Sequence, residues 1–115
     1  MSGFHEFVVE LFESFGPVCI RRMFGAAGIY VGEVMFGLID DETIYLKTDN
    51  VLKAELVAEG SAPWVYSRAP GKWGETSYWR LPEAALDDPD KAAAWARKAL
   101  AVAEAKAAEP KPRRK

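Results

Sequence analysis

The chain has 115 residues, of which 50% are hydrophobic and 28% are charged, as expected for one globular domain with a real core. The formal net charge is −2, and the basic end at residues 111–115 contributes +4, which leaves −6 for the remainder. This acidic remainder argues against a domain that binds nucleic acid through bulk positive charge.

The counts of cysteine and histidine exclude two kinds of site. One cysteine, Cys19, cannot form an internal disulfide and fits a reducing compartment. Together with the single histidine, His5, it cannot make a zinc site, so we expect no metal and no cofactor. The sequence has no secretory leader pattern and no apolar run of about 20 residues. We therefore expect a cytoplasmic protein that makes no membrane contact.

The first predicted element is an amphipathic helix that starts near Ser2 and ends before Gly16-Pro17. Its apolar side chains recur at three- and four-residue steps: Phe4, Phe7, Val8, Leu11, Phe12 and Phe15. A stripe with this period usually faces the core of a domain.

Residues 21–49 predict a meander of three antiparallel strands, with Val18–Met23 as an apolar approach to it. Runs rich in Ile, Val, Phe and Tyr are separated by Val31–Glu33 and Asp40–Glu42, which have the length of hairpin turns. In the middle strand the side chains that project to either face are apolar, so we expect this strand to lie in the centre of the sheet. We expect Val34, Phe36 and Leu38 to face one way, and Met35, Gly37 and Ile39 the other.

The remaining elements complete one domain over residues 1–108. Asp49 predicts the start of a helix that ends before Gly60, and two further strands follow around Trp64–Ser67 and Glu75–Leu81. An alanine-rich helix from Pro89 to about Ala108 comes last, and residues 109–115 predict a disordered basic tail. The fold class is α+β, two-layered, with a five-stranded antiparallel sheet, helices mainly on one face, and the order α-β-β-β-α-β-β-α.

The candidate binding patch lies around the meander. It joins two adjacent arginines, two glycines, two residues of the wetter face of the third strand and an aromatic residue of the last hairpin: Arg21, Arg22, Gly25, Gly28, Tyr45, Lys47 and Trp73. The glycines suggest tight turns or close backbone packing, and a phosphate cradle or small-molecule pocket is the alternative. The aromatic residues of the last hairpin fit either cross-strand pairing or a binding surface. No catalytic residue is predicted, because Cys19 and His5 lack a third orienting group.

The ordered motifs resemble one known family. Arg21-Arg22-Met23-Phe24-Gly25, followed by Gly28 and Tyr30, resembles the opening of the TfoX N-terminal domain of the TfoX/Sxy competence regulators. Further similar segments follow in order: Met35–Leu38, Tyr45–Asp49, Gly60–Tyr66, Ser77–Glu83 and Trp95–Leu100. One departure is Ala26, where the family commonly has another glycine.

The resemblance implies a fold similar to the secretion chaperones and a role in regulating genes for DNA uptake. It supplies no catalytic residues. We therefore expect a stand-alone, non-enzymatic domain that contacts an unidentified protein partner. The alternative is a small-molecule-binding protein or enzyme with a pocket near Gly25–Gly28. A homodimer is a further expectation, through the aromatic fifth strand or the alanine-rich helix.

The only dense run of positive charge lies in the predicted tail, at Lys111, Arg113, Arg114 and Lys115. Such a tail can contact phosphates but reads no bases. We expect weak, salt-sensitive contact with nucleic acid and no sequence-specific binding of DNA by this chain alone.

Overall fold

The structure is a computed structural model that describes residues 3–23, 26–69 and 72–108, with the backbone alone at residues 23, 66–69 and 72–75. The elements, in chain order, are α1 (Gly3–Leu11), β1 (Cys19–Met23), β2 (Ala26–Val31), β3 (Val34–Asp40), β4 (Thr43–Lys47), α2 (Asn50–Ala58), β5 (Pro63–Ala69), β6 (Lys72–Arg80), the 3-10 turn η1 (Glu83–Ala85) and α3 (Pro89–Ala108). The predicted tail at residues 109–115 lies outside the described residues.

The six strands form one antiparallel sheet in the order β1-β2-β3-β4-β6-β5. The prediction of five strands is wrong, because the segment before the meander is itself a strand: β1 pairs with β2 along its whole length. β1 is an edge strand, so it pairs with one neighbour only. Its two exposed arginines, Arg21 and Arg22, interrupt the apolar alternation by which a strand is recognised in a sequence. The expected central position of β3 is confirmed.

The segment that contains the two glycines is organised differently from a tight turn, one of its two expected forms. Gly28 lies inside β2, where it pairs with Arg21 on one side and Leu38 on the other. Gly25 lies outside the described residues. The expectation of a tight turn is therefore wrong at Gly28, which lies in a paired strand.

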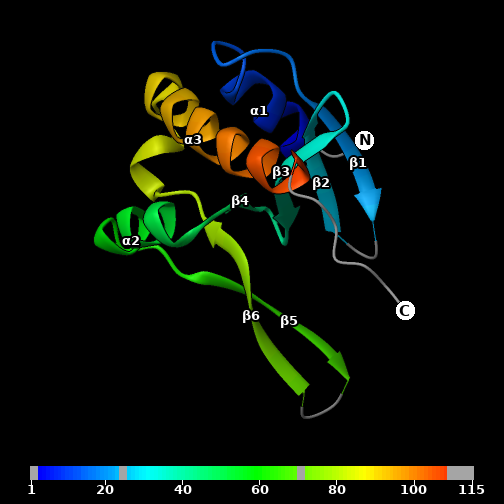
Figure 1. Ribbon diagram of the computed structural model, residues 1–115. Helices are drawn as coiled ribbons and strands as arrows, with labels where there is room; N and C mark the ends of the chain where they lie inside the picture. The colour runs from blue at the N-terminus through cyan, green and yellow to red at the C-terminus, as the bar shows by residue number, and fades with distance from the viewer. Residues whose placement is uncertain (1–2, 24–25, 70–71, 109–115) are drawn as a thin grey trace.

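The core lies between the sheet and the helices. Figure 1 shows α1 and α3 on the same side of the sheet, with α3 running along β3 and β4. The buried residues of α3 are all alanines, whose small side chains let the helix backbone approach the sheet closely. α2 adds Leu52 and Leu56 to the same buried cluster, beside Trp79 and Leu81.

No helix in the described part of the chain is long and apolar enough to cross a membrane.

A bulge in β3 changes the direction of its side chains. Ile29 pairs with Gly37 while Tyr30 pairs with Met35, so Phe36 is an extra residue in the ladder. Phe36 joins the core, where its ring centroid lies 5.8 Å from that of Phe12. The expected alternation, with Phe36 and Leu38 on one face, is wrong because the bulge interrupts it.

The last hairpin extends away from the body of the domain (Figure 1). β4 pairs with β6 only at Tyr78, Trp79 and Arg80. The more distant part of β6 pairs only with β5, as far as Ala69 and Lys72. The sheet is therefore broad beside α3 and narrows to two strands beyond it.

We expect Gly37→Ala to destabilise the domain by about 1–3 kcal/mol, because overpacking forces neighbours to move. A Cβ atom at Gly37 would lie 2.7 Å from the backbone oxygen of Tyr45. Gly3→Ala is the matched control, because a Cβ at Gly3 meets nothing within 4 Å. Urea unfolding measures both; an unchanged midpoint for Gly37→Ala would contradict the close approach of β3 and β4.

Candidate functional site: the aromatic face

The side of the sheet that faces away from the core carries a continuous row of paired residues. Arg21 pairs with Gly28, Gly28 with Leu38, Leu38 with Tyr45, and Tyr45 with Arg80. Paired residues of an antiparallel sheet project to the same side, and their neighbours Ile29, Ile39 and Leu46 belong to the core cluster. We call this side the aromatic face and define it by Arg21, Tyr30, Tyr45, Lys47, Trp64, Tyr78 and Arg80.

Trp64 of β5 connects the aromatic residues of this face. Its ring centroid lies 6.3 Å from that of Tyr45 and 6.4 Å from that of Tyr78, the second at an interplanar angle of 89°. Its indole Nε1 donates a hydrogen bond of 2.9 Å to Oδ2 of Asp40. Edge-to-face packing and this hydrogen bond hold the indole in one orientation.

Cations lie beside the rings. The guanidinium carbon of Arg21 is 4.6 Å from the ring centroid of Tyr30, and Nζ of Lys47 is 5.1 Å from that of Tyr78. Lys47 also donates a hydrogen bond of 2.8 Å to the hydroxyl of Ser77. These distances are typical of cation–π contacts. A partner that binds here would therefore contact both the apolar rings and the charged groups beside them.

Burial changes the ionisation of three groups on this face. It raises the pKa of the Tyr78 hydroxyl, and the nearby Tyr30 adds to the effect. It also raises the pKa of Tyr45, where the charge of Asp40 adds to the effect and that of Arg80 opposes it. Burial lowers the pKa of the Lys47 ammonium, and so does the charge of Lys106 near the end of α3.

Leu38 forms the floor of the aromatic face. Its exposed fraction is 1%, although it is not part of the core cluster on the other side of the sheet. Its register neighbours are Gly28 and Tyr45, so the side chains of the face itself must shield it. The face is therefore a packed surface with an apolar base.

The structure brings together four of the predicted patch residues, namely Arg21, Gly28, Tyr45 and Lys47. Arg22 pairs with the core residue Ala27 and is not part of the aromatic face; its side chain is exposed on edge strand β1.

The other predicted site residues are not located by their side chains. Trp73 pairs with Ser67 in the hairpin, and its side chain is not described. Gly25 and the tail residues Lys111, Arg113, Arg114 and Lys115 lie outside the described residues.

Sequence reasoning missed Tyr30 and Arg80 as members of the site, and it placed Trp64 and Tyr78 only in a possible aromatic surface on the last hairpin. The alternation of Tyr78 and Arg80 with the apolar Trp79 and Leu81 was an available signal. The pairing of β4 with β6 was not available, because the two strands are separated by α2 and β5.

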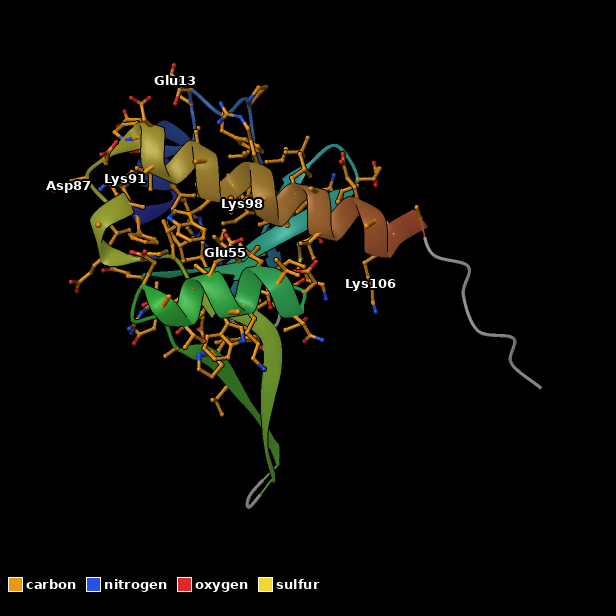
Figure 2. All side chains as sticks on the ribbon, turned by 60° about the vertical axis from the view of Figure 1, so that its left-hand side comes forward. Glu13, Glu55, Asp87, Lys91, Lys98 and Lys106 are labelled. Carbon is orange, nitrogen blue, oxygen red and sulfur yellow. The ribbon has the colours of Figure 1, made fainter. Side chains whose placement is uncertain are left out.

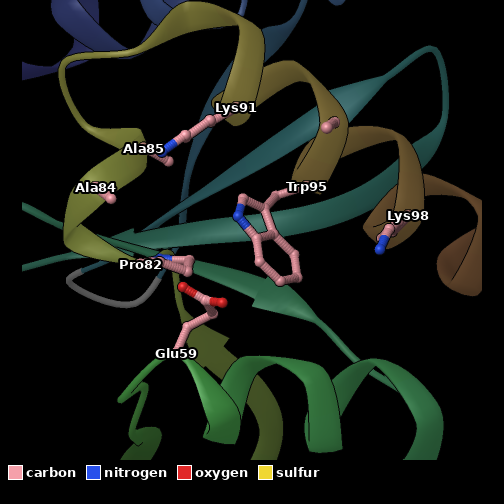
Figure 3. Close-up of a pocket in the computed structure, with 8 residues that line it drawn as sticks. Glu59, Pro82, Ala84, Ala85, Lys91, Trp95 and Lys98 are labelled. Atoms are coloured by element: carbon pink, nitrogen blue, oxygen red, sulfur yellow. The ribbon is translucent and has the colours of Figure 1, made fainter.

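A hollow of about 310 Å³ lies between the helices, and Gly28 is not among the residues that line it. Figure 3 shows the ring of Trp95 in its centre, with Glu59 across from it and Lys91 and Lys98 on the α3 side. Lys98 donates a hydrogen bond of 2.6 Å to Glu55 of α2, which it faces in Figure 2. Both side chains of this ion pair are strongly exposed, so it contributes little to stability.

The described residues contain no group of three or more His, Cys, Asp or Glu side chains that could hold a metal ion.

One comparison with known proteins gives a match. The family model of the TfoX N-terminal domain matches residues 10–103, a range that includes all six strands and α2. No curated protein matches the sequence.

We expect Tyr45 and Tyr78 to ionise above the ordinary tyrosine value of 10.0. A raised pKa in the folded state means that the unfolded chain loses these protons first. The stability from the neutral hydroxyls is thus complete below pH 10 and is lost as the pH rises through the native pKa values. In a pH titration followed by tyrosinate absorbance, the wild type should show an ionisation step above pH 10.0 that is absent from Tyr78→Phe. A variant that instead loses a step at the ordinary tyrosine value would contradict the raised pKa of Tyr78.

Proposed function

Because the chain belongs to the TfoX N-terminal domain family, we propose that it is a competence-regulator-like domain that acts through protein contacts on the aromatic face. The observation that carries the proposal is the set of ordered aromatic and cationic side chains on the side of the sheet away from the core. The role is non-enzymatic and cytoplasmic, and its output is the transcription of genes for DNA uptake.

The chemistry of the aromatic face is that of a protein interface. Trp, Tyr and Arg are the residues most enriched among those that dominate binding energy. Trp64 is already fixed by Asp40 and by two tyrosine rings, so little side-chain entropy is lost when a partner binds.

The charges of the face indicate the kind of partner. Arg21, Lys47 and Arg80 are cationic, while Asp40 accepts the hydrogen bond of Trp64. Like charges disfavour a two-fold contact of this face with itself.

The two surfaces that the sequence offered for a homodimer are each used in part inside the fold. β6 lies between β4 and β5, and α3 buries one row of its alanines while others, such as Ala94 and Ala101, are exposed. We therefore propose a different protein with an acidic contact surface as the partner.

We expect Arg21→Glu to reduce transcription of DNA-uptake genes in a host strain that carries this variant as its only copy. Arg21 is exposed, so the charge reversal leaves the fold intact. Arg97→Glu is the matched control, because Arg97 is also exposed but belongs to α3. Equal reporter activity for the two variants would contradict a role of the aromatic face.

A second pair of variants tests the centre of the face. We expect Trp64→Ala to weaken partner binding by at least about 30-fold, the effect of a central interface residue of roughly 2 kcal/mol. Trp95→Ala makes the same substitution in the helix layer and should leave binding unchanged. Affinity capture from the host followed by mass spectrometry identifies the partner, and calorimetry with that partner measures the loss. A partner retained equally by both folded variants would exclude this face as its binding site.

For DNA, we propose that the chain has no sequence preference of its own. Any weak binding should disappear when residues 111–115 are deleted or when salt is raised several-fold, because it depends on phosphate contacts. A tail-deleted protein that still preferred one duplex by about tenfold, or roughly 1.4 kcal/mol, would contradict this. Arg21 and Arg22 would then be the first residues to mutate.

A further inference from the structure

A small cleft opens where the chain passes from β4 into α2, beside β6. Its volume is about 280 Å³, and the residues that matter to its chemistry are Thr48, Asp49, Asn50, Lys53, Ser77 and Trp79. Figure 1 shows α2 next to the end of β6, on the side of the sheet that carries the helices. This cleft is separate from the aromatic face and from the hollow around Trp95.

Trp79 brings an unused hydrogen-bond donor to this cleft. Its exposed fraction is 6%, and its indole Nε1 has no hydrogen-bond partner among the described residues. A buried polar group without a partner is unfavourable, and a ligand, ion or water usually satisfies it. Trp79 lines the cleft, but its Nε1 atom is itself buried, so an acceptor bound there reaches the N–H group after a shift of the indole.

Several acceptor atoms beside the cleft already receive hydrogen bonds. Oδ1 of Asp49 accepts a 2.8 Å hydrogen bond from the backbone N–H of Leu52, as the N-cap of α2. The backbone oxygen of Ser77 accepts from both the N–H and the hydroxyl of Thr48. The Ser77 hydroxyl oxygen accepts from Lys47, which leaves its own hydrogen to be donated.

Two lysine ammonium groups lie beside the same space, which the Asp49 carboxylate also lines. Nζ of Lys53 lies 5.5 Å from the ring centroid of Trp79, and Nζ of Lys47 is held at the Ser77 hydroxyl. Burial and the charge of Lys106 lower the pKa of the Lys47 ammonium. The N-terminus of α2, a helix of nine residues, adds the positive end of its dipole.

We propose that this cleft binds a small oxyanion, the carboxylate or phosphate group of a metabolite. The Nε1–H of Trp79 and the hydroxyl of Ser77 donate to its oxygens, and the ammonium of Lys53 neutralises its charge. Two donors and two nearby cations fit an oxyanion. This site goes beyond the proposed protein contact and does not depend on it.

The test uses the indole N–H signals of the ¹⁵N-labelled full chain in nuclear magnetic resonance spectra, with the Trp79 signal assigned by its loss in Trp79→Phe. Inorganic phosphate and acetate are added separately, and sodium chloride at equal ionic strength is the control. We expect the Trp79 signal to shift to saturation with at least one oxyanion and to stay in place with chloride. Saturation with both anions indicates a general oxyanion site, and saturation with one identifies the phosphate or the carboxylate as the ligand group.

Two lysine variants complete the experiment. Lys53→Met removes the charge but keeps an apolar side chain, and we expect it to weaken binding about tenfold, as for a hydrogen bond to a charged group. Lys91→Met is the matched control on α3, and it should bind as the wild type does. A Trp79 signal that does not saturate with either anion, or equal affinities for the two variants, would overturn the proposal. If the signal does not saturate, water and not an anion accepts the hydrogen bond of the Trp79 N–H group.

Discussion

The extra residue in β3 determines which side chains share a face of the sheet. In β2, Gly28 and Tyr30 are two residues apart and project together, but their partners Leu38 and Met35 are three residues apart. Leu38 and Met35 can lie on one side only because Phe36 is inserted between them. Without this bulge, Phe36 would pair with Tyr30 and project to the aromatic face, and Met35 would project to the core side.

The same bulge supplies the centre of the core on the other side. Phe36 packs against Phe12 at 5.8 Å and Phe15 at 5.4 Å, and these contacts attach the end of α1 to the sheet. Gly37 follows at once, and its lack of a side chain matters because a Cβ atom there would lie 2.7 Å from the Tyr45 carbonyl oxygen. A large aromatic side chain next to a glycine thus fills the core without spreading the strands.

Local patterns were sufficient to predict that the helices exist, although α1 ends at Leu11 and not just before Gly16. The N-cap expected at Asp49 is present as a 2.8 Å hydrogen bond to the N–H of Leu52, and α3 begins at Pro89 as its sequence indicates. The edge strand β1 was missed because Arg21 and Arg22 interrupt its apolar alternation.

The site depends on pairings between distant residues, so only its parts could be predicted. Tyr45 and Lys47 were identified from the half-polar alternation of β4. That Tyr78 and Arg80 lie beside them follows from the pairing of β4 with β6 across an intervening helix and strand. The contact of Trp64 with Asp40, 24 residues apart in the sequence, has no local signal at all.

Lys47 contacts both the aromatic face and a residue that lines the oxyanion cleft. Its ammonium lies 5.1 Å from the Tyr78 ring centroid on one surface and donates to the Ser77 hydroxyl that lines the other. An anion in the cleft would draw this ammonium away from the ring. The resulting change is limited by the strength of an exposed cation–π contact, about 0.5–1 kcal/mol, or roughly a two- to fivefold effect on a partner's affinity. Such a coupling adjusts the strength of a contact on the aromatic face, and it is too small to switch that contact on or off.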